Sequence, residues 1–292
     1  MHIIRADVLG FCGGVRRAVT AAEKALSENK DGTVYSLGPL IHNPVALNEL
    51  ASRGLRVLES AAIGTVTRHD TVLIRAHGVS PAVAGALREQ TDAVIDATCP
   101  LVTQSQRRAA DFAARGYTIV FAGDKNHGEV AGVQGCAEAA ARANGLPCDF
   151  RLIRSADDVE TLFADGVQER VVLLSQTTFS IPAWDAICAA LAKEIPSLEI
   201  CNTICPATHE RQDALVRLCA QVDGVIVIGG RNSSNTNRLL ATAQKHCGRA
   251  TLIETADEIP DSFYGLRTVG ITAGASTPDS VIAAVESRLK VR

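Results

Sequence analysis

Three cysteines of this 292-residue chain share a local pattern that could bind a metal centre. Cys12, Cys99 and Cys205 each follow an apolar segment and precede a glycine or proline, after which comes a helical sequence containing arginine. A helix N-terminus carries partial positive charge and unsatisfied N–H groups, which favour the thiolate form of a cysteine. The pattern therefore predicts three thiolate-forming sulfurs at helix starts, with Pro100 and Pro206 suited to the first helical turn.

The spacing of these cysteines suggests a repeated architecture, because each is separated from the next by roughly a third of the chain. Three similar α/β units packed about a pseudo-threefold axis would bring the three sulfurs to one centre. Three thiolates on a four-iron cluster leave one iron open for substrate. The ferredoxin spacing is absent, so a simple electron carrier is not expected. Taken one at a time, the cysteines are also consistent with unrelated buried thiols.

The chain has nine cysteines in all, and most of the others have a simpler interpretation. An odd count in a reducing compartment does not predict structural disulfides. Cys201 lies four residues before Cys205 and is left unassigned. The remaining five occur in apolar contexts and are predicted to fill the core as small hydrophobes: Cys136, Cys148, Cys188, Cys219 and Cys247.

Composition limits the class of protein. The chain is 47% hydrophobic and 21% charged, which suits a globular protein with a large core. A net charge of −3 and only 4% aromatic residues argue against nucleic-acid binding. The start lacks a signal peptide, and no apolar run approaches the roughly 20 residues of a membrane span. We therefore expect a cytoplasmic protein with neither nucleic acid nor membrane as a partner.

Apolar strand-like runs alternate with amphipathic segments, which predicts an α/β fold with parallel sheets. The expected strands are Thr33–Leu37, Thr71–Arg75, Ala93–Ala97, Thr118–Ala122, Val171–Ser175, Gly224–Ile228 and Thr268–Thr272. The expected helices are Pro81–Glu89, Ser105–Arg115, Ile181–Glu194, Glu210–Val222, Ser234–His246 and Pro278–Val291, besides the one after Cys12. The units are expected at 14–98, 99–202 and 203–292, with the N-terminal strand in 1–13 packing on the third.

Polar residues gather where predicted strands end, the usual place for sites in α/β proteins. They are His42, His77, His127, Glu129, Gln176, Thr177, Thr178, Ser233, Ser234, Asn235 and Ser276. The Ser233–Asn235 stretch suits either phosphate binding or capping of the next helix, and Ser276 also suits an N-cap. The histidines are also consistent with structural roles.

Glu129 follows a strand-end histidine in what the glycines suggest is a loop. A buried carboxyl there, with a raised pKa, would give protons, whereas a solvated loop glutamate is the plainer alternative. Asp96, in "IDATCP", is expected to fix its loop by accepting N–H hydrogen bonds.

Together these stretches resemble one known family over nearly the whole chain. "GFCGGVRRAV", "LIHNPVAL", "RAHGVSP", "DATCPLVT", "NHGEVAGV", "SQTTFS", "CPATHERQ", "NSSNTNRL" and "TAGASTPD" are similar, in order and approximate spacing, to motifs of the 4-hydroxy-3-methylbut-2-enyl diphosphate reductases, the LytB family. That family supplies the last step of the non-mevalonate isoprenoid pathway. One departure is Gly128, where members often have proline between the histidine and the acid.

The resemblance implies three α/β units around one [4Fe-4S] cluster per chain, held by Cys12, Cys99 and Cys205 with one open iron. It implies a two-electron reductive removal of the hydroxyl from the allylic diphosphate, giving isopentenyl and dimethylallyl diphosphate. Ferredoxin or flavodoxin would donate the electrons. Glu129 would donate the proton, Thr177 would position the hydroxyl and relay protons, and His127 would assist. The residues implied to bind substrate are His42, His77, His127, Thr177, Ser233, Ser234, Asn235 and Ser276.

Three other functions compete with this one on the residues alone. A nicotinamide or flavin oxidoreductase leaves the three cysteines unexplained, and no GxGxxG follows a strand. A non-redox [4Fe-4S] dehydratase would use the same open iron as a Lewis acid. A cluster-based sensor would leave Glu129, His127 and Thr177 without a task. The resemblance favours the reductase over these alternatives.

Overall fold

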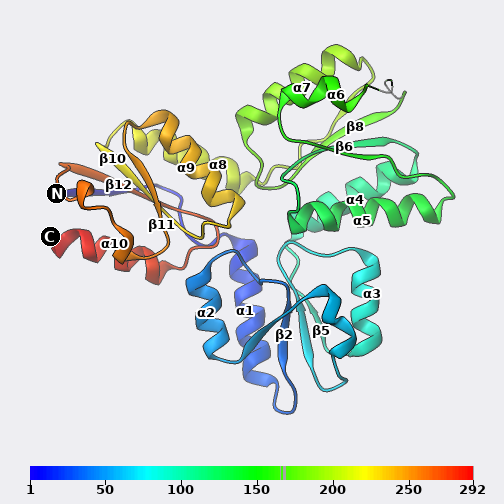
Figure 1. Ribbon diagram of the computed structural model, residues 1–292, viewed down its shortest axis with the longest axis horizontal. Helices are drawn as coiled ribbons and strands as arrows, with labels where there is room; N and C mark the ends of the chain where they lie inside the picture. The colour runs from blue at the N-terminus through cyan, green and yellow to red at the C-terminus, as the bar shows by residue number, and fades with distance from the viewer. Residues whose placement is uncertain (165, 167–168, 292) are drawn as a thin grey trace. The chain divides into compact units, whose positions relative to one another are not determined.

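Strands and helices alternate along the chain and build three sheets of four strands each (Figure 1). The computed structural model describes residues 1–164, 166 and 169–291. Neighbouring strands run parallel. Parallel strands need long crossover connections, and the helices between the strands provide them. The predicted α/β class with three parallel sheets is therefore confirmed.

The described residues divide into two compact units. Unit 1 comprises Met1–Glu28, Pro39–Arg56 and the described residues from Pro206 onward. Unit 2 comprises Asn29–Gly38 and the described residues of Val57–Cys205. The division into three parts at 14–98, 99–202 and 203–292, and its pseudo-threefold arrangement about a cluster, stay predictions.

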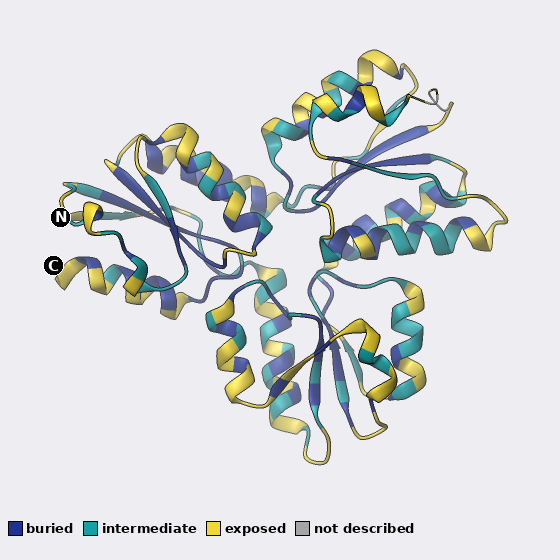
Figure 2. Ribbon diagram, in the orientation of Figure 1, coloured by how far each residue is buried: buried dark blue, intermediate teal, exposed yellow. Residues whose placement is uncertain are grey.

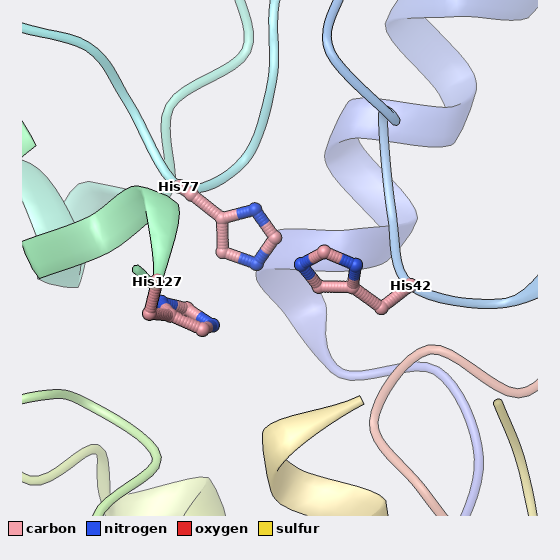
Figure 3. Close-up of side chains that lie close together, drawn as sticks. All are labelled: His42, His77 and His127. Atoms are coloured by element: carbon pink, nitrogen blue, oxygen red, sulfur yellow. The ribbon is translucent and has the colours of Figure 1, made fainter. Parts of the chain in front are cut away.

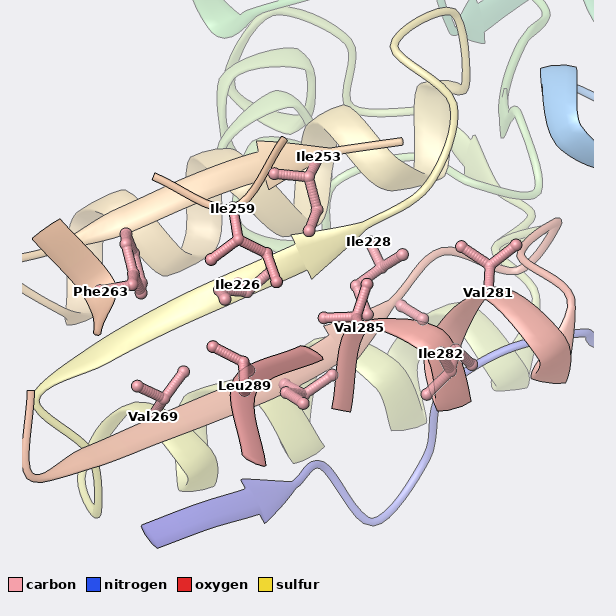
Figure 4. Packing of buried hydrophobic residues seen from close by; sticks show 12 residues of the cluster. Ile226, Ile228, Ile253, Ile259, Phe263, Val269, Val281, Ile282, Val285 and Leu289 are labelled. Carbon is pink, nitrogen blue, oxygen red and sulfur yellow. The ribbon is translucent and has the colours of Figure 1, made fainter. Parts of the chain in front are cut away.

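The sheet of unit 1 has the strand order β1-β12-β10-β11. Alternate residues of β10 point to opposite faces. Ile226 and Ile228 pack with the last helix, α10 (Figure 4), whereas Val225 and Val227 pack with α8 and α9 on the other face. The elements are β1 (His2–Arg5), β10 (Gly224–Ile228), β11 (Ala250–Ile253), β12 (Thr268–Ala273), α8 (Pro206–Cys219), α9 (Ser234–His246) and α10 (Asp279–Val291).

Unit 1 also contains the helix after Cys12 and a short helix after His42. They are α1 (Gly13–Glu28) and α2 (Pro44–Ser52), and the 3-10 turns η3 (Ala256–Glu258) and η4 (Asp261–Phe263) follow β11. Asn43 caps α2, since its Oδ1 accepts the N–H of Ala46 at 3.1 Å. Pro44 is the first helical residue, where its missing N–H costs nothing.

The C-terminal sheet of unit 2 has the order β7-β6-β8-β9 and is covered on both faces. β6 and β8 are buried throughout (Figure 2), as continuous apolar strands between two helix layers should be. The elements are β6 (Thr118–Ala122), β7 (Phe150–Ile153), β8 (Val171–Ser175), β9 (Glu199–Ile200), α4 (Pro100–Ala114), α5 (Gly128–Ala143), η2 (Ala156–Asp158), α6 (Val159–Leu162) and α7 (Ile181–Glu194).

The remaining sheet has the order β3-β2-β4-β5. Its elements are β2 (Val34–Leu37), β3 (Leu55–Leu58), β4 (Thr71–Ile74), β5 (Val94–Asp96), η1 (Ser60–Thr65) and α3 (Pro81–Gln90). Val72 and Ile74 of β4 pack with Leu87 of α3 in one buried cluster. No helix in the described part of the chain combines the length and apolarity needed to cross a membrane.

Several expected elements need correction. The helices expected at Ser105–Arg115 and Glu210–Val222 begin earlier, at Pro100 and Pro206. Ser276 is not an N-cap, because α10 begins at Asp279 and the Ser276 hydroxyl donates to the carbonyl of His42 instead. The loop expected around Glu129 is the start of α5. Short elements missed by the sequence patterns are β3, β7, β9, β11 and α2.

The packing of β10 predicts a large stability effect. Ile226 is fully buried, so Ile226→Ala should lower the free energy of unfolding by about 2–5 kcal/mol through lost burial and a residual cavity. Val291, 84% exposed at the end of α10, provides the control, because Val291→Ala should change the free energy of unfolding by less than about 0.5 kcal/mol. Denaturant titration would measure both, and equal midpoints would contradict the packing described.

Candidate functional site

Each of the three pattern cysteines stands at a helix start. Cys99 is the N-cap of α4, and Cys205 directly precedes Pro206, the first residue of α8. Cys12 precedes α1, and its Sγ accepts the N–H of Val15 at 3.4 Å. All three side chains are half-buried. The predicted placement of these cysteines at helix N-termini is confirmed, and at Cys12 the sulfur itself accepts a free amide of the first turn.

Four of the other cysteines have the opposite character. Burial raises the pKa of the Cys188 and Cys219 thiols to about 11. Burial also raises the pKa of Cys136 and Cys148. These thiols stay protonated at neutral pH, and a protonated thiol is a poor metal ligand. Cys219 lies in a buried core cluster, and Cys148 and Cys188 pack against such clusters, as the sequence predicts, whereas Cys136 is only half-buried.

The most deeply buried acid of unit 2 is held by one threonine. Glu129 is 1% exposed, and its Oε1 accepts the N–H of Thr177 at 2.7 Å. Its Oε2 lies 2.8 Å from the Thr177 hydroxyl, which donates to it. α5 supplies the glutamate, and the turn after β8 supplies the threonine, so two neighbouring parallel strands bring these residues together.

Two histidines of unit 2 lie beside this pair. The rings of His77 and His127 meet edge to face, with centroids 5.0 Å apart (Figure 3). His127 is the N-cap of α5, and its Nδ1 accepts the N–H of Glu129 at 3.2 Å. In the neutral imidazole this leaves Nε2 as the nitrogen that carries the proton. Figure 3 also draws His42, which belongs to unit 1.

Backbone hydrogen bonds tie the loops of unit 2 to its cysteines. The carbonyl of Thr177 accepts the N–H of Cys205 at 2.8 Å, and the carbonyl of Ala76 accepts that of Cys99 at 3.0 Å. Ala76 is the residue before His77. As predicted, Asp96 fixes its loop, because Oδ1 accepts the N–H of Thr98 at 2.9 Å. Hydrogen bonds therefore join Cys205 to the Thr177–Glu129 pair, and join Cys99 to the loop that carries His77.

Unit 1 holds the other predicted substrate residues. Ser233 caps α9, its Oγ accepting the N–H of Thr236 at 3.3 Å, and Ser234 and Asn235 form the first turn. The Ser276 hydroxyl donates to the His42 carbonyl at 3.1 Å. A Cβ at Gly230 would clash with that same carbonyl, so the "GGRNSSN" loop packs directly on the His42 segment. Within unit 1 these three motifs are in contact.

A buried arginine, which the sequence patterns did not single out, supports the Cys12 loop. Arg211 of α8 is 3% exposed, and it donates to the carbonyl of Gly10 at 2.7 Å. The signal was present: Arg211, Leu215 and Leu218 lie on one apolar helix face, where a polar residue is expected to be buried and bonded. The amides of Gly10 and Cys12 are in turn held by Ala273 and Ala275.

The whole chain was compared with known proteins. It matches the family model described as LytB protein over residues 3–290. The chain belongs to the LytB family. A relative from Treponema pallidum (strain Nichols) is 42% identical, the match covering 99% of this chain and 83% of the relative. One from Aquifex aeolicus (strain VF5) is 38% identical over 99% of this chain and 96% of the relative. Both are named 4-hydroxy-3-methylbut-2-enyl diphosphate reductase.

Solved structures of the family agree. One is described as (E)-4-hydroxy-3-methyl-but-2-enyl diphosphate reductase, the terminal enzyme of the non-mevalonate pathway; it covers 100% of both chains at 37% identity with a TM-score of 0.72. The E-1-hydroxy-2-methyl-but-2-enyl-4-diphosphate reductase from Plasmodium falciparum has a TM-score of 0.87 at 26% identity, covering 99% of this chain and 87% of that one. The resemblance drawn from the motifs is confirmed.

Arg211 gives a prediction about the Cys12 loop. Arg211→Leu leaves the Gly10 carbonyl without its buried donor, which costs about 1–3 kcal/mol, so the amides of Gly10 and Cys12 should exchange with solvent about tenfold faster or more. Hydrogen–deuterium exchange would measure this. Asp213→Leu, on the exposed side of the same helix, is the control and should leave both amides unchanged. Equal protection in the two variants would show that Arg211 does not hold the loop.

Proposed function

We propose that this LytB-family chain reduces (E)-4-hydroxy-3-methylbut-2-enyl diphosphate, removing its hydroxyl as water to give isopentenyl and dimethylallyl diphosphate. The observation that carries the proposal is the buried Glu129–Thr177 pair, whose threonine carbonyl accepts the N–H of Cys205. It joins a proton-transfer pair to a residue suited to hold a metal cluster. The relatives bear the name of this reductase, which favours reduction over dehydration or sensing.

The three helix-start cysteines fit a [4Fe-4S] cluster, one per chain, with one iron left without a protein ligand. Cys12, Cys99 and Cys205 are sulfur donors at helix N-termini, where partial positive charge favours an anionic centre. A Cβ at Gly13 would meet no atom within 4 Å, so there is open space beside Cys12 for a bulky group. When bound, the cluster would supply electrons and a Lewis-acidic iron for the substrate oxygen.

Glu129 and Thr177 supply the protons in this proposal. A threonine hydroxyl both donates and accepts, so the 2.8 Å contact between Oγ1 and Oε2 can carry a proton outward from a protonated Glu129. Thr177 thereby positions the substrate hydroxyl and relays the proton that makes it a leaving group. His127 assists through Nε2, because Nδ1 is engaged with the amide of Glu129.

The diphosphate is assigned to residues of both units. His42, Ser233, Ser234, Asn235 and Ser276 come from unit 1, and His77 and His127 from unit 2. The start of α9 brings serine hydroxyls, an asparagine amide and a helix N-terminus together, which suit phosphate oxygens. Anchoring the diphosphate would orient the allylic end and exclude water from it. We assign the role of electron donor to a small ferredoxin or flavodoxin.

The wild-type protein tests the proposal directly. After anaerobic purification, the iron content and visible spectrum should indicate one four-iron cluster per chain. Reduced methyl viologen should be consumed only when the allylic diphosphate is added, and both five-carbon diphosphates should form. A folded protein without iron would overturn the cluster assignment. An iron-loaded protein that binds the diphosphate without consuming electrons would overturn the reductase assignment.

Glu129→Gln tests the proton donor. Glutamine keeps the shape and a hydrogen bond to Thr177 but cannot deliver a proton, so kcat should fall by about 10²–10⁴-fold while iron content and substrate binding persist. Steady-state assays with an iron determination would measure this. Turnover near that of the wild type would refute the role of Glu129.

Cysteine substitutions test the ligand set. Cys99→Ala removes a proposed thiolate, so the purified protein should lose the visible absorbance of the cluster and most of its iron. Cys188→Ala provides the control, because the Cys188 thiol, with its pKa of about 11, lies against the α7 core. If both variants retained the same iron, Cys99 would not be a ligand.

A further inference from the structure

The proposed function gives no role to Arg75, whose cationic side chain directly follows β4. Arg75 is the residue after Ile74, the last residue of β4, and lies two positions before His77. It is half-buried, and its Nε has no hydrogen-bond partner in the part of the chain that the structure describes. Burial lowers the pKa of this guanidinium, and the carboxylate of the exposed Glu59 opposes that shift only through its charge. The charge of Arg75 is therefore placed here without an ion-pair partner among the described residues.

Two glycines provide the space that the guanidinium occupies. A Cβ at Gly38 would lie 2.6 Å from Nη1 of Arg75 and 3.3 Å from Cζ. A Cβ at Gly128 would lie 2.8 Å from the same Cζ and would also clash with Nη2. Real Cβ atoms do not approach other atoms so closely, so any larger residue at either position would push the guanidinium aside. All three residues belong to unit 2.

The contact with Gly128 places the Arg75 guanidinium at the start of α5. Gly128 is the first residue of α5. It lies between His127, which caps the helix, and Glu129, whose N–H donates to Nδ1 of His127. The guanidinium thus packs on the peptide that joins the two residues. A helix N-terminus disfavours a nearby cation by about 0.3–1 kcal/mol, so a gain in helix stability does not explain why the guanidinium lies there.

We propose that Arg75 is a positioning residue for the proton-transfer residues of α5. Its guanidinium fills the space between Gly38 and Gly128, and it fixes the first turn of α5, with His127 and Glu129, against the β4 loop that carries His77. The inference rests on the proposed function, because it gives Arg75 the task of placing Glu129 and His127 for that reaction.

The test compares Arg75→Ala, Arg75→Lys, Gly128→Ala and the double variant Arg75→Ala/Gly128→Ala with the wild type. Gly128→Ala displaces the guanidinium without removing its charge. The matched control is Gly85→Ala in α3, where an added Cβ meets no atom within 4 Å. All proteins are purified anaerobically with their iron.

The first readout does not depend on activity. The rate at which diethyl pyrocarbonate modifies His127, followed by mass spectrometry against pH, gives the midpoint of its titration. A nearby cation disfavours the imidazolium, so Arg75→Ala and Gly128→Ala should raise that midpoint by about 0.5 pH unit or more, and Arg75→Lys by less. Within unit 2, the titratable residues that contact His127, namely His77, Glu129 and Asp124, are the same in every variant. Loosened packing alone would change the plateau rate and leave the midpoint where it was.

The second readout is turnover of the allylic diphosphate. Arg75→Ala and Gly128→Ala should each lower kcat by about 10- to 100-fold, and the double variant should fall no further than the worse single one, because both changes remove one contact. Gly85→Ala should match the wild type. Identical midpoints in all variants, unchanged kcat in Gly128→Ala, or losses that multiply would each overturn the proposal. If the wild type does not reduce the substrate, the proposed function fails, and the midpoints still decide whether Arg75 fixes His127.

Discussion

Parallel pairing of strands is the constraint on which the rest of this molecule depends. It places all strand ends of a sheet at one edge, and it starts each return helix there with unsatisfied N–H groups. The residues that cap these helices are the ones with chemistry to offer: Cys99 at α4, His127 at α5 and Ser233 at α9. In this chain three of the helix caps are therefore also residues of the candidate site.

The sequence patterns worked best where burial is continuous. β6, β8 and β10 are fully buried runs, and α7 and α9 have clear ends, so their predicted bounds match the structure. They failed at α5, where the glycines around Glu129, Gly128 and Gly132 among them, suggested a loop. The segment is helical nonetheless, and glycine fits its positions because neighbouring side chains come close. A Cβ at Gly132 would lie 3.0 Å from Gln106, and one at Gly135, further along the helix, would clash with Ser80. Intrinsic propensity carries no information about such contacts, which arise only from tertiary packing.

The residue types of the candidate site were predictable, but their partners were not. Glu129 and Thr177 are 48 positions apart, and only the pairing of β6 with β8 brings them together. The tasks of Arg75 and Arg211 were hidden for the same reason, since each contacts backbone far away in the sequence. Sequence motifs identify the residues that could do the chemistry, whereas the residues that position them become apparent only from the three-dimensional arrangement of the loops.

The cap of α5 has a consequence of its own. Most helices are capped by an oxygen, which remains an acceptor across the neutral pH range. Here the acceptor is an imidazole nitrogen, Nδ1 of His127, which holds the amide of Glu129. A proton taken up at Nδ1 turns this acceptor into a second donor facing the first, and the hydrogen bond is lost. Local order at the start of α5 therefore depends on the protonation state of His127: protonation at Nδ1 would loosen the backbone at Glu129, the residue proposed to transfer a proton.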